Sequence, residues 1–127
     1  MAVEYRVGSD GKPTPTQGSD AFSLLSTDLT ASYTTSGQIL RDQSAFVGYL
    51  IAIGTGGSNP TATVQYQDSP DDSNYANISG ALETLTAAGT KRVAMASPTG
   101  KYVRATGSIS GTTPTFSGFQ IIVVAKT

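Results

Sequence analysis

This chain of 127 residues contains no cysteine, no histidine and no tryptophan. Without cysteine it can form no disulfide and no thiolate metal site, and it has no cysteine nucleophile. Cysteine usage therefore does not indicate whether the protein works in an oxidising or a reducing compartment. Without histidine it lacks the commonest general base and the commonest metal ligand, so its many serines have no imidazole to activate them. We therefore expect a protein that is not an enzyme and needs no cofactor.

Charged residues are also scarce, at 13% of the chain, against about 25% in an ordinary soluble domain. The net charge of −1 predicts no general attraction to nucleic acid. No run reaches the ~18 apolar residues of a membrane helix, and no signal peptide opens the chain. We expect no membrane contact, and export, if it occurs, by lysis or inside an assembly.

Serine and threonine make up about a quarter of the residues, which favours strands and turns over helix interiors. The length fits one domain, and such a domain hides about two-thirds of the surface that its unfolded chain exposes. The chain is therefore long enough to build a core without disulfides.

The first twenty residues differ from the rest. Pro13, Pro15 and several glycines interrupt regular structure, and the stretch "KPTPT" favours an extended path. We therefore predict an extended arm over residues 1–20, with a short strand at residues 3–7, followed by one domain over residues 21–127. The arm is either a disordered terminus or a segment that becomes ordered on a neighbouring subunit.

From residue 21 onward the apolar pattern is that of short strands. The run "AFVGYLIAIG" (45–54) suits a strand covered on both faces. "TATVQYQD" (61–68) alternates, which predicts that Ala62, Val64 and Tyr66 share the buried face. "TFSGFQIIVVAK" (115–126) places one apolar set on each side: Phe119, Ile121, Val123 and Ala125 on the first, Ile122 and Val124 on the second.

Weaker strand candidates are "AFSLLSTDL" (21–29), "SYTTSGQIL" (32–40) and "SNYANIS" (73–79). "GALETLTAAG" (80–89) fits a short helix or a strand equally well, and "GTGGSNP" (54–60) is predicted to be a flexible connection. Turn signals every ~8–12 residues without a long amphipathic helix indicate an all-β fold. We predict a jelly roll or β-sandwich of about eight short antiparallel strands.

The segment "RVAMASPTGKYVRA" (92–105) predicts a hairpin with Pro98-Thr99-Gly100 as its loop. Pro98 suits the start of a type I turn, and Gly100 suits the left-handed bulge position that follows. Pairing Met95 with Val103, and Val93 with Ala105, gathers the apolar residues on one face. The other face then displays Arg92 and Arg104 as diagonal neighbours beside Tyr102.

That outward face is either an ordinary solvated surface with intramolecular acidic partners or a contact patch for another protein. Arginine and tyrosine are the side chains that interfaces favour. The candidate partner-binding residues are Arg92, Tyr102 and Arg104, together with Tyr5 and Arg6 of the arm.

The loop "QDSPDDSN" brings Asp68, Asp71 and Asp72 within five positions. Calcium takes oxygen ligands from loops of this kind, but the spacing does not match a twelve-residue EF-hand loop. Aspartate, serine, proline and asparagine are also common turn formers. The loop is either a solvated turn or a weak calcium candidate, and we predict no metal site elsewhere.

Two stretches resemble small all-β structural proteins of tailed bacteriophages: "TATVQYQDSPDDSNYANISGA" and "KRVAMASPTGKYVRATGSISGTTPTFSGFQIIVVAK". In such proteins a strand of the type xVQxSxDxxxF/YxxI precedes a "GKYVR" strand and a final apolar strand. The resemblance covers about residues 45–126. Its motifs are turn chemistry and alternation, and they contain no invariant chemical group.

The resemblance is greatest to capsid decoration (cement) proteins. It implies a virion location at the capsid surface, contact with a major capsid protein and self-association as a homo-oligomer, a dimer or trimer. Similar modules in tail and fibre proteins serve adhesion, so a carbohydrate- or receptor-binding module is the alternative. A sugar site needs exposed aromatic rings, for which Tyr33, Tyr75 and Tyr102 are the candidates. The apolar excess of residues 45–54 and 119–126 is either a covered core or a subunit contact.

Overall fold

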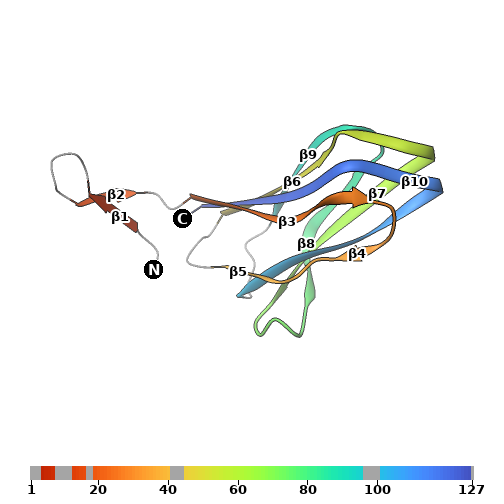
Figure 1. The fold of residues 1–127 in the computed structure, drawn as a ribbon. Helices are drawn as coiled ribbons and strands as arrows, with labels where there is room; N and C mark the ends of the chain where they lie inside the picture. Colours follow the sequence, from red (N-terminus) through yellow and green to blue (C-terminus); the bar gives the residue numbers. More distant parts are fainter. Residues whose placement is uncertain (1–3, 8–12, 17–18, 41–44, 96–100, 127) are drawn as a thin grey trace.

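The computed structural model describes residues 4–7, 13–16, 19–40, 45–95 and 101–126. Within these ranges the chain forms strands and no helix, which confirms the predicted all-β class (Figure 1). The strands are β1 (Glu4–Val7), β2 (Pro13–Thr16), β3 (Ser19–Leu29), β4 (Tyr33–Thr34), β5 (Gln38–Ile39), β6 (Ala45–Ala52), β7 (Gly54–Ser69), β8 (Ala76–Leu85), β9 (Gly89–Met95) and β10 (Tyr102–Lys126).

All pairing is antiparallel, and β10 is the centre of the main sheet. The first half of β10 pairs with β7 on one side and with β4 and β5 on the other. Its second half pairs with β6 on the one side and with β3 on the other. Beyond β7 lies β8, and beyond β6 lies β9. The eight strands therefore lie in four antiparallel rows: β3 to β5, β10, β6 with β7, and β8 with β9. Each row extends through both halves of the sheet.

The four rows of strands bend near their middle, so the two halves of the sheet face each other. The register of β7 against β10 shifts at Ser110–Thr112 and again at Thr112–Thr115. Gly57 and Gly111 lie at this bend with φ of 84° and 123°, which a residue with a Cβ rarely adopts. Figure 1 shows the bend at the right-hand end, where β7 and β10 turn back together.

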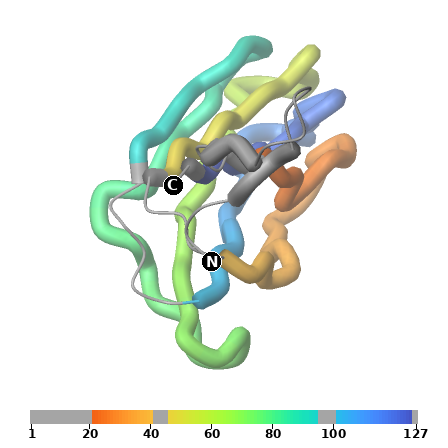
Figure 2. The backbone as a smooth tube through the Cα atoms, turned by 90° about the vertical axis from the view of Figure 1, so that its left-hand side faces the viewer, coloured from red at the N-terminus to blue at the C-terminus, as the bar shows by residue number. Residues whose placement is uncertain are grey.

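The upper half consists of β3, β6, β9 and the second half of β10, and the lower half consists of β4, β5, β7, β8 and the first half of β10 (Figure 2). The core lies between the halves and is mainly apolar, with Thr35 and Ser69 as buried polar residues. Its fully enclosed side chains, with 0% exposure, are Leu50, Ala62, Val64, Tyr66, Ala81, Val103, Ala105, Phe116, Phe119, Ile121, Val123 and Ala125.

One contact shows how closely the halves approach. Tyr66 of the lower half points at Gly48 of the upper half, where a Cβ would lie only 2.2 Å from the tyrosine hydroxyl oxygen. Near the bend, the Tyr33 ring packs 6.2 Å from that of Phe119, and its hydroxyl donates a 3.1 Å hydrogen bond to the carbonyl oxygen of Thr63. Aromatic rings therefore fill the space between the two halves of the sheet.

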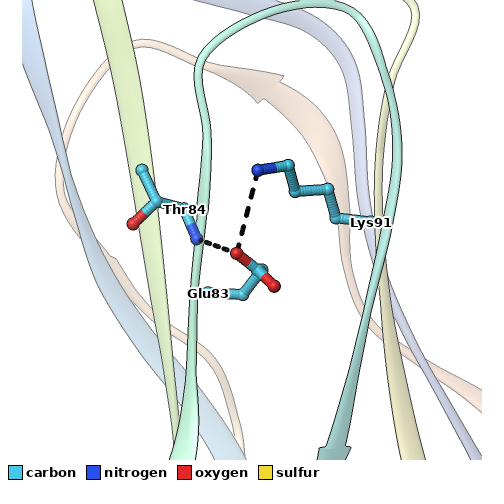
Figure 3. A network of polar contacts seen from close by, with 3 residues as sticks. All are labelled: Glu83, Thr84 and Lys91. Atoms are coloured by element: carbon cyan, nitrogen blue, oxygen red, sulfur yellow. Dashed lines mark hydrogen bonds and ion pairs between the residues drawn. The ribbon is translucent and has the colours of Figure 1, made fainter.

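At the edge formed by β8 and β9, the halves are joined by an ion pair (Figure 3). Glu83 lies two residues from the buried Ala81 and Leu85, and Lys91 lies two residues from the buried Val93, so both side chains start on the core side of their strands. Lys91 Nζ approaches Glu83 Oε1 at 3.9 Å, and the same oxygen accepts a 2.9 Å hydrogen bond from the Thr84 N–H. The pair covers the open edge of the core, although a partly exposed ion pair contributes at most about 1 kcal/mol.

The two buried tyrosines predict opposite effects on stability. Burial raises the pKa of both phenols, so both remain neutral. Tyr66 Oη has no hydrogen-bond partner among the described residues, whereas Tyr33 Oη has one. Because an unpaired buried hydroxyl costs about 1–3 kcal/mol, Tyr66→Phe should raise the free energy of unfolding by about 1 kcal/mol. Tyr33→Phe should lower it by a similar amount. Urea denaturation measures both, and a less stable Tyr66→Phe variant would contradict this arrangement.

The apolar pattern predicted strand faces correctly. Ala62, Val64 and Tyr66 are buried, and so are the four residues predicted for one face of the last strand. The strand predicted at residues 3–7 corresponds to β1. For residues 80–89 the sequence allowed a helix or a strand. The structure has residues 80–85 in strand β8.

Two predictions about these segments were wrong. The stretch at residues 54–60 is not a flexible connection but the start of β7, because β10 runs beside it and supplies hydrogen-bond partners through the bend. Residues 45–54 are not covered on both faces. Phe46, Leu50 and Ala52 enter the core, but Val47 and Ile51 point outward and are half-buried.

Candidate functional site

The outer surface of the upper half carries a band of apolar side chains. We call this band the apolar face. In sheet register, Val47 lies beside Val124, Tyr49 beside Ile122, and Ile51 beside Gln120. None of the described strands crosses over this band in Figure 1. Because adjacent strands bring the residues together, the band is a continuous patch. Its members are Val47, Tyr49, Ile51, Ile122 and Val124, all half-buried.

Arg92 borders the apolar face. It lies opposite Tyr49 in the β6–β9 register and is exposed. Within the described part of the chain, no carboxylate forms an ion pair with it. An intramolecular acidic partner, the ordinary explanation for an exposed arginine, is thus absent for Arg92 among the described residues.

The outer surface of the lower half has the opposite character. We call it the polar face. Cross-strand hydrogen bonds link Thr34 Oγ1 to Thr106 Oγ1 at 2.9 Å and Thr63 Oγ1 to Ser108 Oγ at 2.8 Å. The Gln65 amide donates to the carbonyl oxygens of Ile78 and Ala81, which stabilises the irregular part of β8. Ile39 and Leu82 are large apolar side chains that lie exposed on this half of the sheet.

A connected group of polar side chains crosses three strands of the polar face. Arg104 Nε donates to Gln67 Oε1 at 2.9 Å, and Gln67 Nε2 donates to Asn77 Oδ1 at 2.9 Å. The Arg104 guanidinium carbon lies 3.8 Å from the centroid of the Tyr75 ring. The Tyr75 hydroxyl donates a short hydrogen bond to Asp72. Arg104 is therefore held in one plane by stacking and by its Nε bond.

Burial, together with the hydrogen bond to Asp72, raises the pKa of Tyr75 to about 12. This phenol is consequently neutral and keeps its proton for that bond at physiological pH. Tyr102 is half-buried on the same face.

The predicted hairpin of residues 92–105 was wrong. Val93 lies opposite Gly48, and Ala105 lies opposite Tyr66, so the two strands pair with different partners in different halves of the sheet. Met95 likewise pairs with Phe46. The proposed turn at 98–100 lies outside the described residues. Arg92 and Arg104 are consequently not diagonal neighbours, because one borders the apolar face and the other lies on the polar face.

The alternation behind that prediction was nevertheless correct. Val93, Val103 and Ala105 are buried, while Arg92 is exposed and Arg104 is half-buried. The prediction of Tyr33 as an exposed ring of a sugar site was wrong, because this ring packs against Phe119 between the two halves of the sheet. Tyr75 and Tyr102 remain on the surface. Tyr5 and Arg6 lie in β1, whose side chains the structure does not describe.

The acidic loop is organised by Asp71. Its Oδ1 accepts hydrogen bonds from the backbone N–H groups of Asn74, at 2.8 Å, and Ser73, at 2.9 Å. The Ser69 hydroxyl donates to Oδ1 at 3.0 Å, and the Asn74 amide donates to Oδ2 at 2.6 Å. These donors, with the Asn74 N–H first, hold the pKa of Asp71 far below its usual range. The carboxylate therefore acts as the acceptor that closes this turn.

No group of three acidic residues among those described converges on a metal position, and Asp68, Asp71 and Asp72 are all described. A calcium ion would have to compete with the four donors around Asp71. We expect equal melting midpoints in EDTA and in calcium. A midpoint raised by calcium would establish a site.

The Asp71 turn also predicts a pH dependence. Because the pKa of Asp71 is depressed in the fold, its stabilisation is complete above the unfolded value of about 3.9. That stabilisation is lost only as pH falls through the much lower folded value. The amide NMR shifts of Ser73 and Asn74 should therefore stay unchanged at pH 4–5, and Asp71→Ala should alter them at every pH. A transition of these amides near pH 4 in the native chain would contradict the arrangement.

No helix long and apolar enough to cross a membrane occurs in the described ranges. No protein-family model matches the chain, and no curated protein matches its sequence. Solved structures share its fold. The crystal structure of PBSX exported protein XepA superposes with a TM-score of 0.60 at 16% identity, over 99% of this chain and 44% of that one.

A second structure, SPBc2 prophage-derived protein YomS, gives a TM-score of 0.56 at 6% identity and covers 88% of this chain and 96% of that one. The chain thus spans less than half the length of XepA and nearly all of YomS. At these identities the likeness shows a shared all-β fold.

Proposed function

We propose that this protein is a structural component of a bacteriophage particle, a capsid decoration (cement) protein that binds the major capsid protein shell and stabilises it as a homo-oligomer. The observation that carries the proposal is the contrast between the two outer surfaces. A body with one apolar face and one hydrogen-bonded polar face is built to have one side covered by protein. The shared fold with phage-related proteins agrees with this role.

In this proposal the chain acts by adhesion, with no catalytic residue, cofactor, nucleic acid or membrane. The apolar face is covered by protein in the assembled particle. On the polar face, Arg104 and Tyr102 are the contact residues for the shell, because an arginine already held by stacking and by a hydrogen bond loses little side-chain entropy when a partner binds it.

Co-sedimentation with purified expanded shells tests the proposal. We expect saturable binding at a fixed number of copies per shell, and shells that survive heating or dilution better when decorated. Arg104→Glu should weaken binding without changing the melting midpoint by more than a few degrees. Shells that sediment without the protein at micromolar concentrations would refute a decoration role.

A second candidate function rests on the polar group around Tyr75. A half-buried aromatic ring at the surface, beside amide and guanidinium groups, is an arrangement that can bind a sugar, as a tail or fibre module would. One face of the Tyr75 ring is already covered by Arg104, which weakens this alternative. A glycan-array signal that Tyr75→Ala removes, in a protein that ignores shells, would favour it.

A further inference from the structure

We propose that the apolar face binds the apolar face of a second copy, so that two chains pack face to face about a two-fold axis that runs parallel to β6 and β10. This inference rests on the proposed function only for the claim that protein covers the face, and it names that protein as a second copy of this chain. The polar faces of both copies then remain exposed for the shell.

The apolar face extends beyond its five half-buried members. Ile53 follows β6 in the same alternation and is 77% exposed. It lies across Gly118 of β10, where a Cβ would be 2.5 Å from Ile53 Cδ1. From Val47 to Ile53 the face is about 20 Å long, and its four strands make it about 19 Å wide. Two such surfaces bury about 800 Å² when they meet, which is the size of a weak, reversible interface.

One line of residues across the strands shows that the face is complementary to itself. Arg92 of β9 lies beside Tyr49 of β6. Ile122 of β10 comes next, and Ser23 of β3 ends the line. A two-fold axis between β10 and β6 reverses this line in the second copy. Tyr49 then meets Ile122 of the second copy, and Arg92 meets Ser23 of the second copy.

The neighbouring line of residues has the same character. Val47 and Val124 lie at its centre. Ala94 ends it on β9 and Ala21 ends it on β3, and both alanines are exposed. Reversal sets valine on valine and alanine on alanine. Small side chains at both borders therefore allow the two sheets to approach to the distance of about 10 Å at which sheets pack.

Arg92 selects the direction of the two-fold axis. It has no carboxylate partner within the described residues. Ser23 Oγ is exposed and donates its proton to the carbonyl oxygen of Leu25 at 3.1 Å, so its lone pairs can accept a hydrogen bond from an arginine. An axis across the strands would instead place both Arg92 side chains at one border, where like charges repel.

Engineered cysteines test the arrangement, because the chain has none of its own. One tagged version carries Ala94→Cys, and a second, with a different tag, carries Ala21→Cys. Sheets about 10 Å apart are too far from each other for an unstrained disulfide, so a short bismaleimide joins the thiols. With protein at up to about 1 mM, where weak contacts are populated, we expect a product that carries both tags.

The matched control places both tags on Ala94→Cys. Because the two β9 strands lie at opposite borders of the proposed dimer, this mixture should give less than a tenth of the cross-linked product. Equal yields from the two mixtures, a larger yield from the control, or no product in either would overturn the inference.

A charge placed opposite Arg92 gives a second test, with an expected gain. Ser23→Asp should tighten self-association at least threefold in sedimentation equilibrium, because its carboxylate faces Arg92 of the second copy. Ser23→Lys should weaken self-association by a similar factor, and Thr112→Asp at the bend should leave it unchanged. If Ser23→Asp weakens self-association as much as Ser23→Lys does, Arg92 does not lie opposite Ser23 and the arrangement is wrong.

The two proposals fail separately. Shells decorated at the native level by a protein that gives no cross-link would refute the pairing of apolar faces alone. A cross-linked dimer that ignores shells would refute the decoration role alone.

Discussion

Replacing Gly48 with alanine is expected to lower the free energy of unfolding by about 3 kcal/mol, and the melting midpoint by roughly 10 °C. The added Cβ would lie 2.2 Å from Tyr66 Oη and 2.4 Å from Cζ of the same ring. Tyr66 is fully buried and cannot rotate away. Elsewhere in a strand the same change is neutral or favourable by about 0.5–1 kcal/mol, so the loss would report this contact alone.

Two further variants make the Gly48 experiment specific. Gly54→Ala is the control, because a Cβ there would meet only the Ser117 hydroxyl, at 2.8 Å, and that exposed side chain can rotate. Tyr66→Leu in the Gly48→Ala background should recover part of the lost stability, since the far end of the ring is removed. If the losses in free energy of unfolding are additive in this double-mutant cycle, the two halves of the sheet do not meet at Gly48.

Aspartate at Ile122 and Val124 together is expected to abolish binding to shells while the domain stays folded. Both side chains are half-buried on the apolar face, so their loss should cost the monomer only about 1–2 kcal/mol. A charge buried without a partner in an interface costs far more. We expect affinity to fall at least a hundredfold, or about 2.7 kcal/mol, in co-sedimentation.

Thr112→Asp is the matched control for the aspartate pair, because it is an exposed residue of β10 too but lies at the bend, outside both the apolar face and the Arg104 group. It should bind shells with unchanged stoichiometry. Circular dichroism and the melting midpoint show whether each variant is folded. If the Ile122→Asp/Val124→Asp protein is folded and still decorates shells at the native level, the apolar face has no part in assembly.

The sequence alone determined which side of each strand is buried. Alternation is a local property, so Val64 and Tyr66, or Val103 and Ala105, point to the core whichever strand lies beside them. The absence of histidine and cysteine likewise excluded imidazole and thiolate groups from any site, from the sequence alone. Turn chemistry was less reliable, because the Pro98-Thr99-Gly100 motif suggested that the strands on either side of it pair with each other.

Only the tertiary structure decided which strands pair and what the outer surfaces become. β9 joins β6, and β10 runs through both halves of the sheet, so residues that are close in sequence lie on opposite faces. The physical reason is that β pairing joins segments far apart along the chain, and the apolar pattern that orients a strand does not name its neighbour. Val47 and Val124 are 77 positions apart, yet their adjacency in the sheet creates the apolar face.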